Sequence, residues 1–360
     1  MWIGYVSCGS GHKKAAQAIH QVLSPGTSFL FDLMDFSPGV VKFIYEQGYK
    51  LLVKYLPFIW RFIYFIYSYS FFSRILLFSH RLIFRSFLKK IIKENPQVVI
   101  STHFFFSQLV SFLKQKKLLD CRHITVVTDY GVYPLWVNKD TDYYIAATEK
   151  VKSQLVDFYK VEPDRVKVWG LPLRRGFFTA VKEGLEGKYK KPDNIFTIFL
   201  FSSEFGIGPF KRIIEAFYKK CGLIVIYADN KHIRDYIASL KEPLYLLGFD
   251  YKEEIWDLLD LCDLVVTKAG GLSISESLLK KKPMVFIHAI PGQEDYNIKF
   301  ILDNGLGFNP KGIQDLIETI NKIVDNPEIL AKLNKSFDKI NVQDCALKIK
   351  ELALKVDAEY

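Results

Sequence analysis

The sequence predicts an α/β protein made of two Rossmann-like domains, each with a parallel sheet, that face a cleft. Short β-rich runs alternate with helical patterns along the chain, which is typical of βαβ units and a parallel sheet. The alternation is interrupted once, and 360 residues are enough for two domains with separate cores. With 49% apolar and 24% charged residues, the chain is not expected to be disordered, collagen-like or a coiled coil.

The first alternating series predicts an N-terminal domain over residues 1–171. Its expected strands are, in chain order, 2–7, 28–32, 97–101, 123–128, 143–147 and 166–169. Residues 172–194 then become basic and glycine-containing with no clear period, and we interpret them as the interdomain linker.

The second series predicts a C-terminal domain over residues 195–340. Its expected strands are 195–202, 223–227, 244–247, 264–267 and 284–287. The last segment, 341–360, is expected to form one closing helix, because residues 343–355 are amphipathic. In open α/β sheets ligands bind beyond the carboxyl ends of the strands, so the loops after these strands are the places to look for chemistry.

The cysteines and one acidic motif argue against a metal or disulfide framework. The five cysteines are odd in number, far apart and never in a C-x-x-C pair, which favours a reducing cytosol. Met1 leads directly into a strand-like run without a basic n-region, so no secretory signal is expected and the chain is predicted to stay inside the cell. Asp140-Thr141-Asp142 matches the D-x-D of metal-binding sugar transferases, but we interpret it as a turn before a strand.

Most of the net charge of +10 lies in residues 36–93, which we call the basic aromatic segment. It holds ten basic residues, one acidic residue and seventeen Phe, Tyr and Trp residues. A basic surface favours nucleic acid or an anionic membrane, and this density of apolar bulk favours the membrane over nucleic acid. The longest uncharged stretch, 62–73, has twelve residues, whereas a spanning helix needs about 20. The segment is therefore expected to lie on the bilayer as a peripheral element.

Basic residues in this segment recur at helical spacing. Lys50, Lys54 and Arg61 form one series, and a second consists of Arg74, Arg81, Arg85 and Lys89. Each series is expected to stay near one face of a helix, with a break at Pro57. The residues expected to contact the membrane are Lys50, Lys54, Phe58, Trp60, Arg61, Phe62 and Phe65. The alternative is that the aromatic residues form an internal hairpin that covers the N-terminal sheet.

A glycine-rich loop follows the first expected strand. Its residues Gly9, Gly11 and His12 lead into an alanine-rich helix. Glycines let the backbone approach a ligand, and the helix N-terminus favours negative charge. The loop lacks the third glycine of a dinucleotide fingerprint and the G-K-[ST] of a P-loop, although Asp32 stands where a nicotinamide dehydrogenase has its acid. His12 is either a general base or a residue that caps or packs at the helix start.

A second glycine-rich loop follows the strand at 264–267. Gly270 and Gly271 precede a helix, which places backbone N–H groups and the helix dipole where a diphosphate could bind. Glu276 lies one turn into that helix, in position to accept from the two hydroxyls of a ribose. The alternative is that Ser273 and Glu276 form a capping box at the helix start.

Two more loops of the second domain are candidates for ligand binding. In residues 290–297, Gln293 and Glu294 supply the amide and carboxylate groups that recognise sugars. The first strand of the domain runs into residues 201–209, which again contain glycines. Three candidate ligand loops thus belong to one domain.

Four motifs together resemble a known family. They are G-S-G-H-K-K-A-A-Q-A-I at 9–19, T-D-Y-G-V-Y-P-L-W at 128–136, T-K-A-G-G-L-S-I-S-E at 267–276 and P-G-Q-E-D-Y-N at 291–297. They look like the monogalactosyldiacylglycerol synthases and the processive diacylglycerol glucosyltransferases of bacteria, which are family 28 glycosyltransferases related to the peptidoglycan UDP-N-acetylglucosamine transferase. The similarity covers nearly the whole chain in the expected order. It implies a GT-B fold, a UDP-sugar donor in the C-terminal domain, a lipid acceptor in the N-terminal domain, and inversion without a bound metal or cofactor.

The resemblance also implies roles for individual residues. His12 and Asp129 would be catalytic, Gly270 and Gly271 would face the diphosphate, and Glu276 the ribose. Gln293 and Glu294 would bind the sugar. The donor set is Gly206, Gly208, Asn230, Gly248, Phe249, Thr267, Lys268, Gly270, Gly271, Leu272, Ser273, Glu276, Gln293, Glu294 and Asn297. The acceptor set is Gly9, Gly11, Tyr133 and Trp136.

The chain departs from the family pattern in two places. Tyr133 stands where the family usually has His, which affects the acceptor site. Ser202, Ser203 and Glu204 stand where the family has a glycine triplet, which makes the diphosphate loop bulkier.

The expected reaction is transfer of glucose or galactose from UDP-glucose or UDP-galactose to diacylglycerol, at the cytoplasmic face of an anionic membrane. An acceptor hydroxyl, deprotonated by His12 or Asp129, would attack the anomeric carbon as UDP leaves. Three alternatives remain: transfer of N-acetylglucosamine to an undecaprenyl-linked muropeptide, a UDP-sugar 2-epimerase, and a non-catalytic lipid-binding module. The basic aromatic segment argues against the first two, and the intact donor motifs argue against the third.

Overall fold

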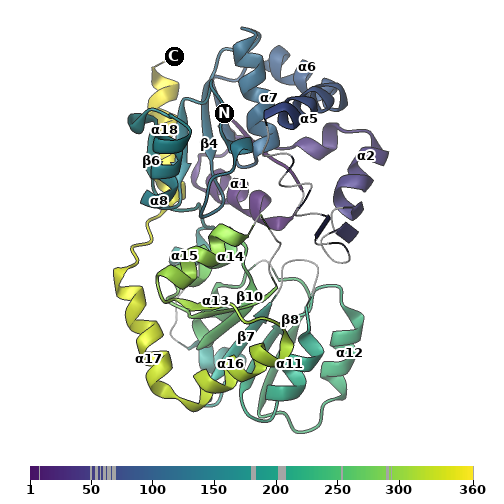
Figure 1. The fold of residues 1–360 in the computed structure, drawn as a ribbon, viewed down its shortest axis with the longest axis vertical. Coiled ribbons are helices and arrows are strands. Elements are labelled where there is room, and N and C mark those ends of the chain that lie inside the picture. The colour runs from purple at the N-terminus through teal and green to yellow at the C-terminus, as the bar shows by residue number, and fades with distance from the viewer. Residues whose placement is uncertain are drawn as a thin grey trace. The chain divides into compact units, whose positions relative to one another are not determined.

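The computed structural model describes residues 1–7, 9–48, 51–52, 56, 58–59, 62, 66, 70–179, 184–201, 208–252, 254–288, 292 and 294–359, without the side chains at 46–47, 70–76, 186 and 288. The chain divides into two compact units (Figure 1). The first unit comprises residues 1–175, 290–296 and 343–360, and the second comprises 176–289 and 297–342.

The first unit contains a six-stranded parallel sheet of order β2-β1-β3-β4-β5-β6. Its strands are β1 (Trp2–Tyr5), β2 (Phe29–Asp32), β3 (Val98–Ser101), β4 (Arg122–Val126), β5 (Tyr143–Ala146) and β6 (Val166–Val168). All six were expected from the sequence, and the observed ends differ from the expected ones by at most two residues. The predicted α/β class is confirmed in this half of the chain.

The second unit also contains a six-stranded parallel sheet, of order β12-β11-β10-β7-β8-β9. Its strands are β7 (Thr197–Phe201), β8 (Gly222–Ile226), β9 (Tyr245–Phe249), β10 (Leu264–Lys268), β11 (Met284–His288) and β12 (Gly307–Phe308). The sequence predicted the first five. It missed β12, which has two residues and shows no alternation. Gly307 is required there because a Cβ would overlap the carbonyl oxygen of Met284 on β11.

Helices cover both faces of the first sheet. They are α1 (Ser10–Val22), α2 (Gly39–Phe43), α5 (Ser70–Ile83), α6 (Arg85–Glu94), α7 (Phe104–Gln115), α8 (Glu149–Ser153) and α18 (Cys345–Ala358), joined by the short helical turns η1 (Leu33–Phe36), η2 (Ile44–Gly48), η3 (Pro134–Trp136), η4 (Gln154–Phe158) and η5 (Pro163–Arg165). Because successive strand residues point to opposite faces, Trp2 packs with α6 and α7, whereas Ile3 packs with α1 and α18. The closing helix therefore completes the first unit.

The second sheet is covered by helices in the same way. They are α9 (Gly176–Thr179), α10 (Leu185–Tyr189), α11 (Phe210–Phe217), α12 (Lys231–Ser239), α13 (Trp256–Leu261), α14 (Gly271–Leu279), α15 (Asp295–Asp303), α16 (Ile313–Asp325) and α17 (Pro327–Ser336), followed by the turn η6 (Phe337–Lys339). Residues 176–194, which we expected to form a linker, lie in this unit and contain α9 and α10. There Phe177 packs edge-on against Trp256 of α13, with ring centroids 5.5 Å apart.

The basic aromatic segment is divided between core and surface. Phe84, Phe87 and Ile91 are fully buried and pack on the first sheet, so the core alternative is correct for the α6 end of the segment. The buried Phe84 separates α5 from α6, and the expectation that Arg74, Arg81, Arg85 and Lys89 share one helix face is therefore wrong.

The rest of the segment presents apolar side chains to solvent. Ten of the seventeen exposed large apolar side chains in the described parts of the chain lie in residues 36–93, which make up about a sixth of its length. Phe58 and Phe62 are among them. Lys50, Lys54, Pro57, Trp60, Arg61 and Phe65 lie outside the described residues. Within the described ranges, none of the helices combines the length and apolar character that crossing a bilayer requires.

Candidate functional site

His12 lies where three strands of the first sheet end. It is in the first turn of α1, directly after the loop that follows β1, and it is 9% exposed. Its Nδ1 is 2.7 Å from the carbonyl oxygen of Thr102, which follows β3, and 3.1 Å from Oγ1 of Thr128, which follows β4. Because a carbonyl oxygen can only accept, Nδ1 carries the ring proton. The basic lone pair of the neutral imidazole is therefore on Nε2.

Thr102 fixes the backbone as well as the ring of His12. Its hydroxyl donates to the carbonyl oxygen of His12 at 3.0 Å, and its N–H donates to the carbonyl oxygen of Gly4 at 2.9 Å. The start of α1 is thus attached to the ends of β1 and β3. Gly9, with φ 102°, takes the left-handed conformation that the sharp entry into α1 requires.

His103 packs against the ring of His12. The ring centroids are 4.4 Å apart in an edge-on arrangement. His103 Nδ1 accepts from the N–H of Phe105 at 3.1 Å, which caps α7. Burial, together with His12 and His80 nearby, lowers the pKa of His103 well below 6.5, so this ring is neutral at pH 7. His103 therefore places no charge beside the ring of His12.

The sequence analysis did not single out Thr102 or His103. A signal was present, because a Ser-Thr-His run ends the third expected strand at the same edge of the sheet as His12.

Asp129 and the aromatic residues of the T-D-Y-G-V-Y-P-L-W motif follow β4. Asp129 is 8% exposed and is the residue after Thr128, whose hydroxyl contacts His12. Trp136 is buried, with its ring centroid 6.2 Å from that of His12. Tyr133 lies at the start of η3, where its hydroxyl donates to the carbonyl oxygen of Gly292. The structure therefore brings His12, Asp129 and Trp136 into one region of the first unit.

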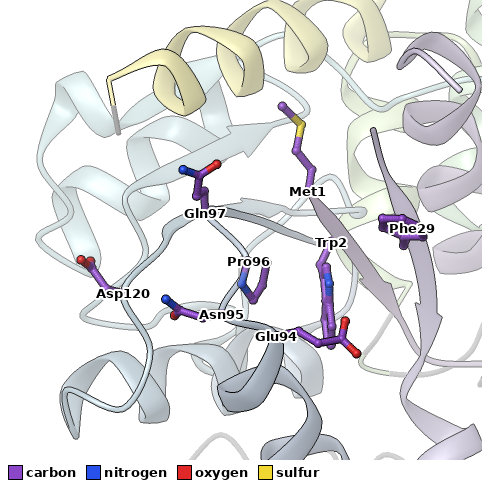
Figure 2. Close-up of a pocket in the computed structure, with 8 residues that line it drawn as sticks. All are labelled: Met1, Trp2, Phe29, Glu94, Asn95, Pro96, Gln97 and Asp120. Carbon is purple, nitrogen blue, oxygen red and sulfur yellow. The ribbon is translucent and has the colours of Figure 1, made fainter. Parts of the chain in front are cut away.

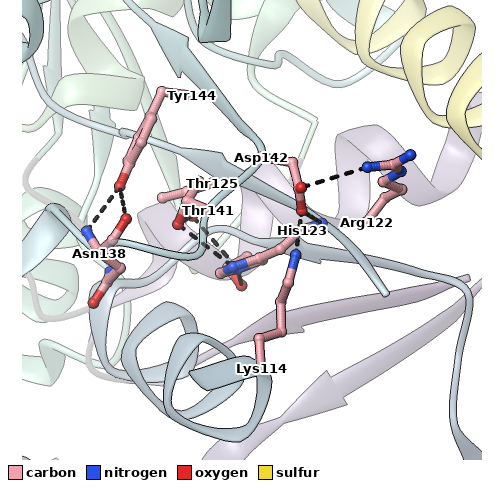
Figure 3. Close-up of polar contacts among 9 residues, drawn as sticks. Lys114, Arg122, His123, Thr125, Asn138, Thr141, Asp142 and Tyr144 are labelled. Carbon is pink, nitrogen blue, oxygen red and sulfur yellow. Dashed lines mark hydrogen bonds and ion pairs between the residues drawn. The ribbon is translucent and has the colours of Figure 1, made fainter. Parts of the chain in front are cut away.

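The D-x-D motif belongs to a structural network (Figure 3). Asp142 accepts from Lys114 and from the N–H of His123, and lies 3.8 Å from Arg122 Nη1. Thr141 is buried with its hydroxyl 3.4 Å from Nδ1 of His123. Burial, with Lys114 nearby, lowers the pKa of His123 to about 3. These contacts fit a turn that anchors β5, as the sequence analysis expected.

The second unit contains the Gly270–Gly271 loop at the end of β10. α14 begins at Gly271, and Gly270 occupies the N-cap position without a side-chain hydrogen bond to the first turn. The capping-box alternative is therefore wrong, because Ser273 lies inside the helix and its carbonyl oxygen accepts from Oγ of Ser277 at 2.9 Å. Glu276 is 2% exposed on the same helix. Within the described residues no side-chain cap covers the backbone N–H groups at the helix start, which suits an anion.

The other expected donor residues occupy varied positions. Gly208 precedes α11, Asn230 caps α12 by accepting from the N–H of Ile233, and Gly248 with Phe249 ends β9. Thr267 and Lys268 end β10, Leu272 and Ser273 lie in the first turn of α14, and Asn297 is in α15. Glu294 is buried just before α15. Gly206 and Gln293, like Ser202, Ser203 and Glu204, lie outside the described residues.

A pocket of about 680 Å³ opens at the amino ends of the strands of the first sheet, opposite to the end where His12 lies (Figure 2). It is lined by Met1, Trp2, Phe29, Glu94, Asn95, Pro96, Gln97 and Asp120. These residues stand at the amino ends of β1, β2, β3 and β4, whereas ligands of parallel sheets bind at the carboxyl ends. We therefore place the candidate functional site at the carboxyl ends of the strands, where His12 lies.

Two family models match the chain. The model described as monogalactosyldiacylglycerol (MGDG) synthase matches residues 12–173, and the model described as glycosyl transferases group 1 matches residues 229–339. The first match begins at His12 and includes Thr102, Asp129 and Trp136.

Curated relatives agree with these models. The probable monogalactosyldiacylglycerol synthase 3 of rice is 28% identical over 339 residues, 87% of this chain and 65% of that protein. The processive diacylglycerol β-glucosyltransferase of Staphylococcus aureus strain JH9 is 29% identical over 260 residues, 70% of this chain and 62% of that protein. The chain thus spans slightly less than two thirds of the length of these relatives.

Solved structures share the fold along the whole chain. MurG of Acinetobacter baumannii has a TM-score of 0.62 at 12% identity and covers 98% of this chain and 99% of its own. HepE of Anabaena, crystallised in complex with UDP, has a TM-score of 0.58 at 14% identity and covers 100% of both chains. The expected GT-B fold is confirmed.

Proposed function

We propose that this chain, which is similar to monogalactosyldiacylglycerol synthases and processive diacylglycerol glucosyltransferases, is a glycosyltransferase that transfers glucose or galactose from a UDP-sugar to diacylglycerol. The observation that supports this most is the buried His12, whose Nδ1 proton is held by the Thr102 carbonyl so that Nε2 is the basic nitrogen. This histidine opens the part of the chain that matches the MGDG synthase model.

The donor is proposed to bind through the second glycine-rich loop and the polar loop before α15. The N–H groups at the start of α14, after Gly270 and Gly271, bind the diphosphate, because the positive end of the helix dipole attracts its charge. Glu276 accepts from the ribose hydroxyls. Gln293 and Glu294 take the hexose by paired hydrogen bonds, as amide and carboxylate groups do in sugar sites.

The reaction is proposed to be a direct displacement. The acceptor hydroxyl gives its proton to His12 Nε2, its oxygen forms a bond to the anomeric carbon, and the bond from that carbon to the UDP oxygen breaks with both electrons going to UDP. Attack from the face opposite to UDP inverts the anomeric centre. Asp129, adjacent to the threonine that contacts His12, is the alternative base. The α14 N-terminus stabilises the charge that grows on the diphosphate.

The acceptor is a lipid, so the enzyme must reach a membrane surface. The exposed apolar residues of the basic aromatic segment include Val40 and Phe43 of α2, and Phe78 and Leu82 of α5. Basic side chains accompany them, and Arg81 lies 5.1 Å from the ring centroid of Phe78. Apolar insertion together with attraction of Lys and Arg to anionic lipid gives reversible binding. The proposed location is the cytoplasmic face of the membrane.

The proposed function is tested by incubating the protein with UDP-glucose or UDP-galactose and diacylglycerol micelles. We expect free UDP and a glycosyldiacylglycerol to appear together. Release of UDP without glycolipid, or epimerised nucleotide sugar as the product, would contradict the proposed acceptor.

Replacing Glu276 with Ala is expected to raise the donor KM and lower kcat/KM. Loss of a charge-assisted hydrogen bond to the ribose removes about 1.5 to 3 kcal/mol, or about 10- to 150-fold in kcat/KM. The matched control is Glu318→Ala, an exposed glutamate of α16 in the same unit. A fall in melting temperature with unchanged donor KM would assign Glu276 to structure alone.

Replacing His12 with Ala is expected to lower kcat by about 10² to 10⁴ while UDP affinity, measured by calorimetry, stays near that of the wild type, because the variant loses the general base. His20→Ala provides the control, since His20 lies on the same helix and its Nδ1 contacts only the Ser28 hydroxyl at 2.8 Å among the hydrogen bonds described. If Asp129→Asn abolishes turnover and His12→Ala retains most of it, the base is Asp129.

Replacing Phe58 and Phe62 together with Ser is expected to weaken co-sedimentation with phosphatidylglycerol vesicles by about tenfold or more, because two apolar rings no longer leave water. Wild-type binding should rise with phosphatidylglycerol content and fall with salt, and changing Lys50, Lys54 and Arg61 to Ser should reduce this dependence.

Phe158→Ser is the matched control for the vesicle experiment. Phe158 is 83% exposed on η4, next to α8, which packs on β5 and β6. The basic aromatic segment instead follows β2, which lies at the opposite edge of the sheet from β6. Equal binding by the double variant and by this control would remove the membrane role of Phe58 and Phe62.

A further inference from the structure

A buried amide links α15 to the diphosphate loop. Asn297 is the third residue of α15, and no part of its side chain reaches solvent. Its Nδ2 donates to the carbonyl oxygen of Ala269 at 2.9 Å. The orientation of the amide follows from the partner, because a carbonyl oxygen can only accept. α14 and α15 lie side by side in Figure 1, as this bond requires.

Ala269 is the residue on which the geometry of the loop depends. The chain leaves β10 at an irregularity in its pairing with β11, between Thr267 and Lys268. The N–H of Gly270 then turns back to the carbonyl oxygen of Lys268 at 2.9 Å. Ala269, in the middle of this tight turn, is fully buried, and α14 begins two residues later. A shift of its peptide group would re-aim the N–H groups of the helix start.

A second observation marks the base of this loop as more than packing. The hydroxyl of Thr267 is fully buried and has no hydrogen-bond partner in the described parts of the chain. A buried hydroxyl without a partner costs stability that a valine at the same position would not. A polar group kept at such a cost calls for an explanation, and contact with a bound ligand provides one.

We infer that Asn297 is a positioning residue, which holds Ala269 so that the N–H groups at the start of α14 point at the donor diphosphate. This inference rests on the proposed UDP-sugar donor, and it gives Asn297 a different role from the direct donor contact that the family resemblance implies. Because Asn297 contacts the loop at the main-chain carbonyl of Ala269, its effect is on phosphate binding. Recognition of the uracil and ribose is left unchanged.

The test compares UDP with uridine. For Asn297→Asp, which keeps the size of the side chain but turns an oxygen toward the Ala269 carbonyl, we expect UDP affinity measured by calorimetry to fall about tenfold or more. Uridine affinity, measured by ligand-observed NMR titration, should change less than about threefold, because uridine has no phosphate. If the Asp variant does not fold at the assay temperature, Asn297→Ala makes the same comparison with the carbonyl left unbonded.

Asn304→Ala is the matched control. Asn304 follows α15, and its Nδ2 donates to the carbonyl oxygen of Phe300 at 2.7 Å, but at an exposed position. It should bind both ligands as the wild type does. Equal weakening of UDP and uridine, or undiminished UDP binding by the Asn297 variants, would overturn the positioning role. Failure of the wild type itself to bind UDP would overturn the proposed donor and with it this inference.

Discussion

The hydrogen bond from His12 Nδ1 to the Thr102 carbonyl is the contact on which the site of the first unit depends. A side chain in the first turn of a helix can rotate freely unless something outside the helix holds it. Here a main-chain carbonyl at the end of the neighbouring strand β3 selects both the tautomer and the direction of the ring. The parallel sheet makes this possible, because it brings the ends of β1, β3 and β4 to one edge.

The second unit uses the same device with a different side chain. A backbone carbonyl, that of Ala269, again receives a buried side-chain donor, and the group so fixed is a loop at the end of a central strand. In both units the accepting carbonyl belongs to a short loop, while the helix that supplies the donor is packed on the sheet. Rigidity thus comes from main-chain atoms, which substitution of a loop residue leaves in place.

The sequence predicted the strands well and the local hydrogen bonds poorly, for identifiable reasons. Short apolar runs that alternate with helical patterns revealed eleven of the twelve strands, because a buried parallel strand has to be apolar. β12 was missed because it is too short to show a pattern. The T-D and Gly-Gly motifs located the strand ends at which the site residues lie. The contact that Thr102 makes with the His12 ring could not be predicted from the sequence, because it uses the main-chain carbonyl, which every residue has. The S-x-x-E spacing left a capping box open as an alternative, because this spacing occurs inside helices as well as at their starts; here the helix begins at Gly271. Phe87 and Phe62 are the same residue type in the same basic aromatic segment, so the sequence could not show that Phe87 is buried and Phe62 exposed.

The position of α18 has a consequence for how the chain is made. This helix buries Ala16 and Ile19 of α1 against the first sheet, yet it follows the whole of the second unit in the chain. Until residues 345–358 have been synthesised, this apolar face lacks part of its cover, so the unit that contains His12 cannot reach its final packing before the second unit has been made. A chain that has reached residue 342 therefore contains all of the second unit but an incomplete first unit, and in that interval chaperones would shield the exposed apolar face from aggregation.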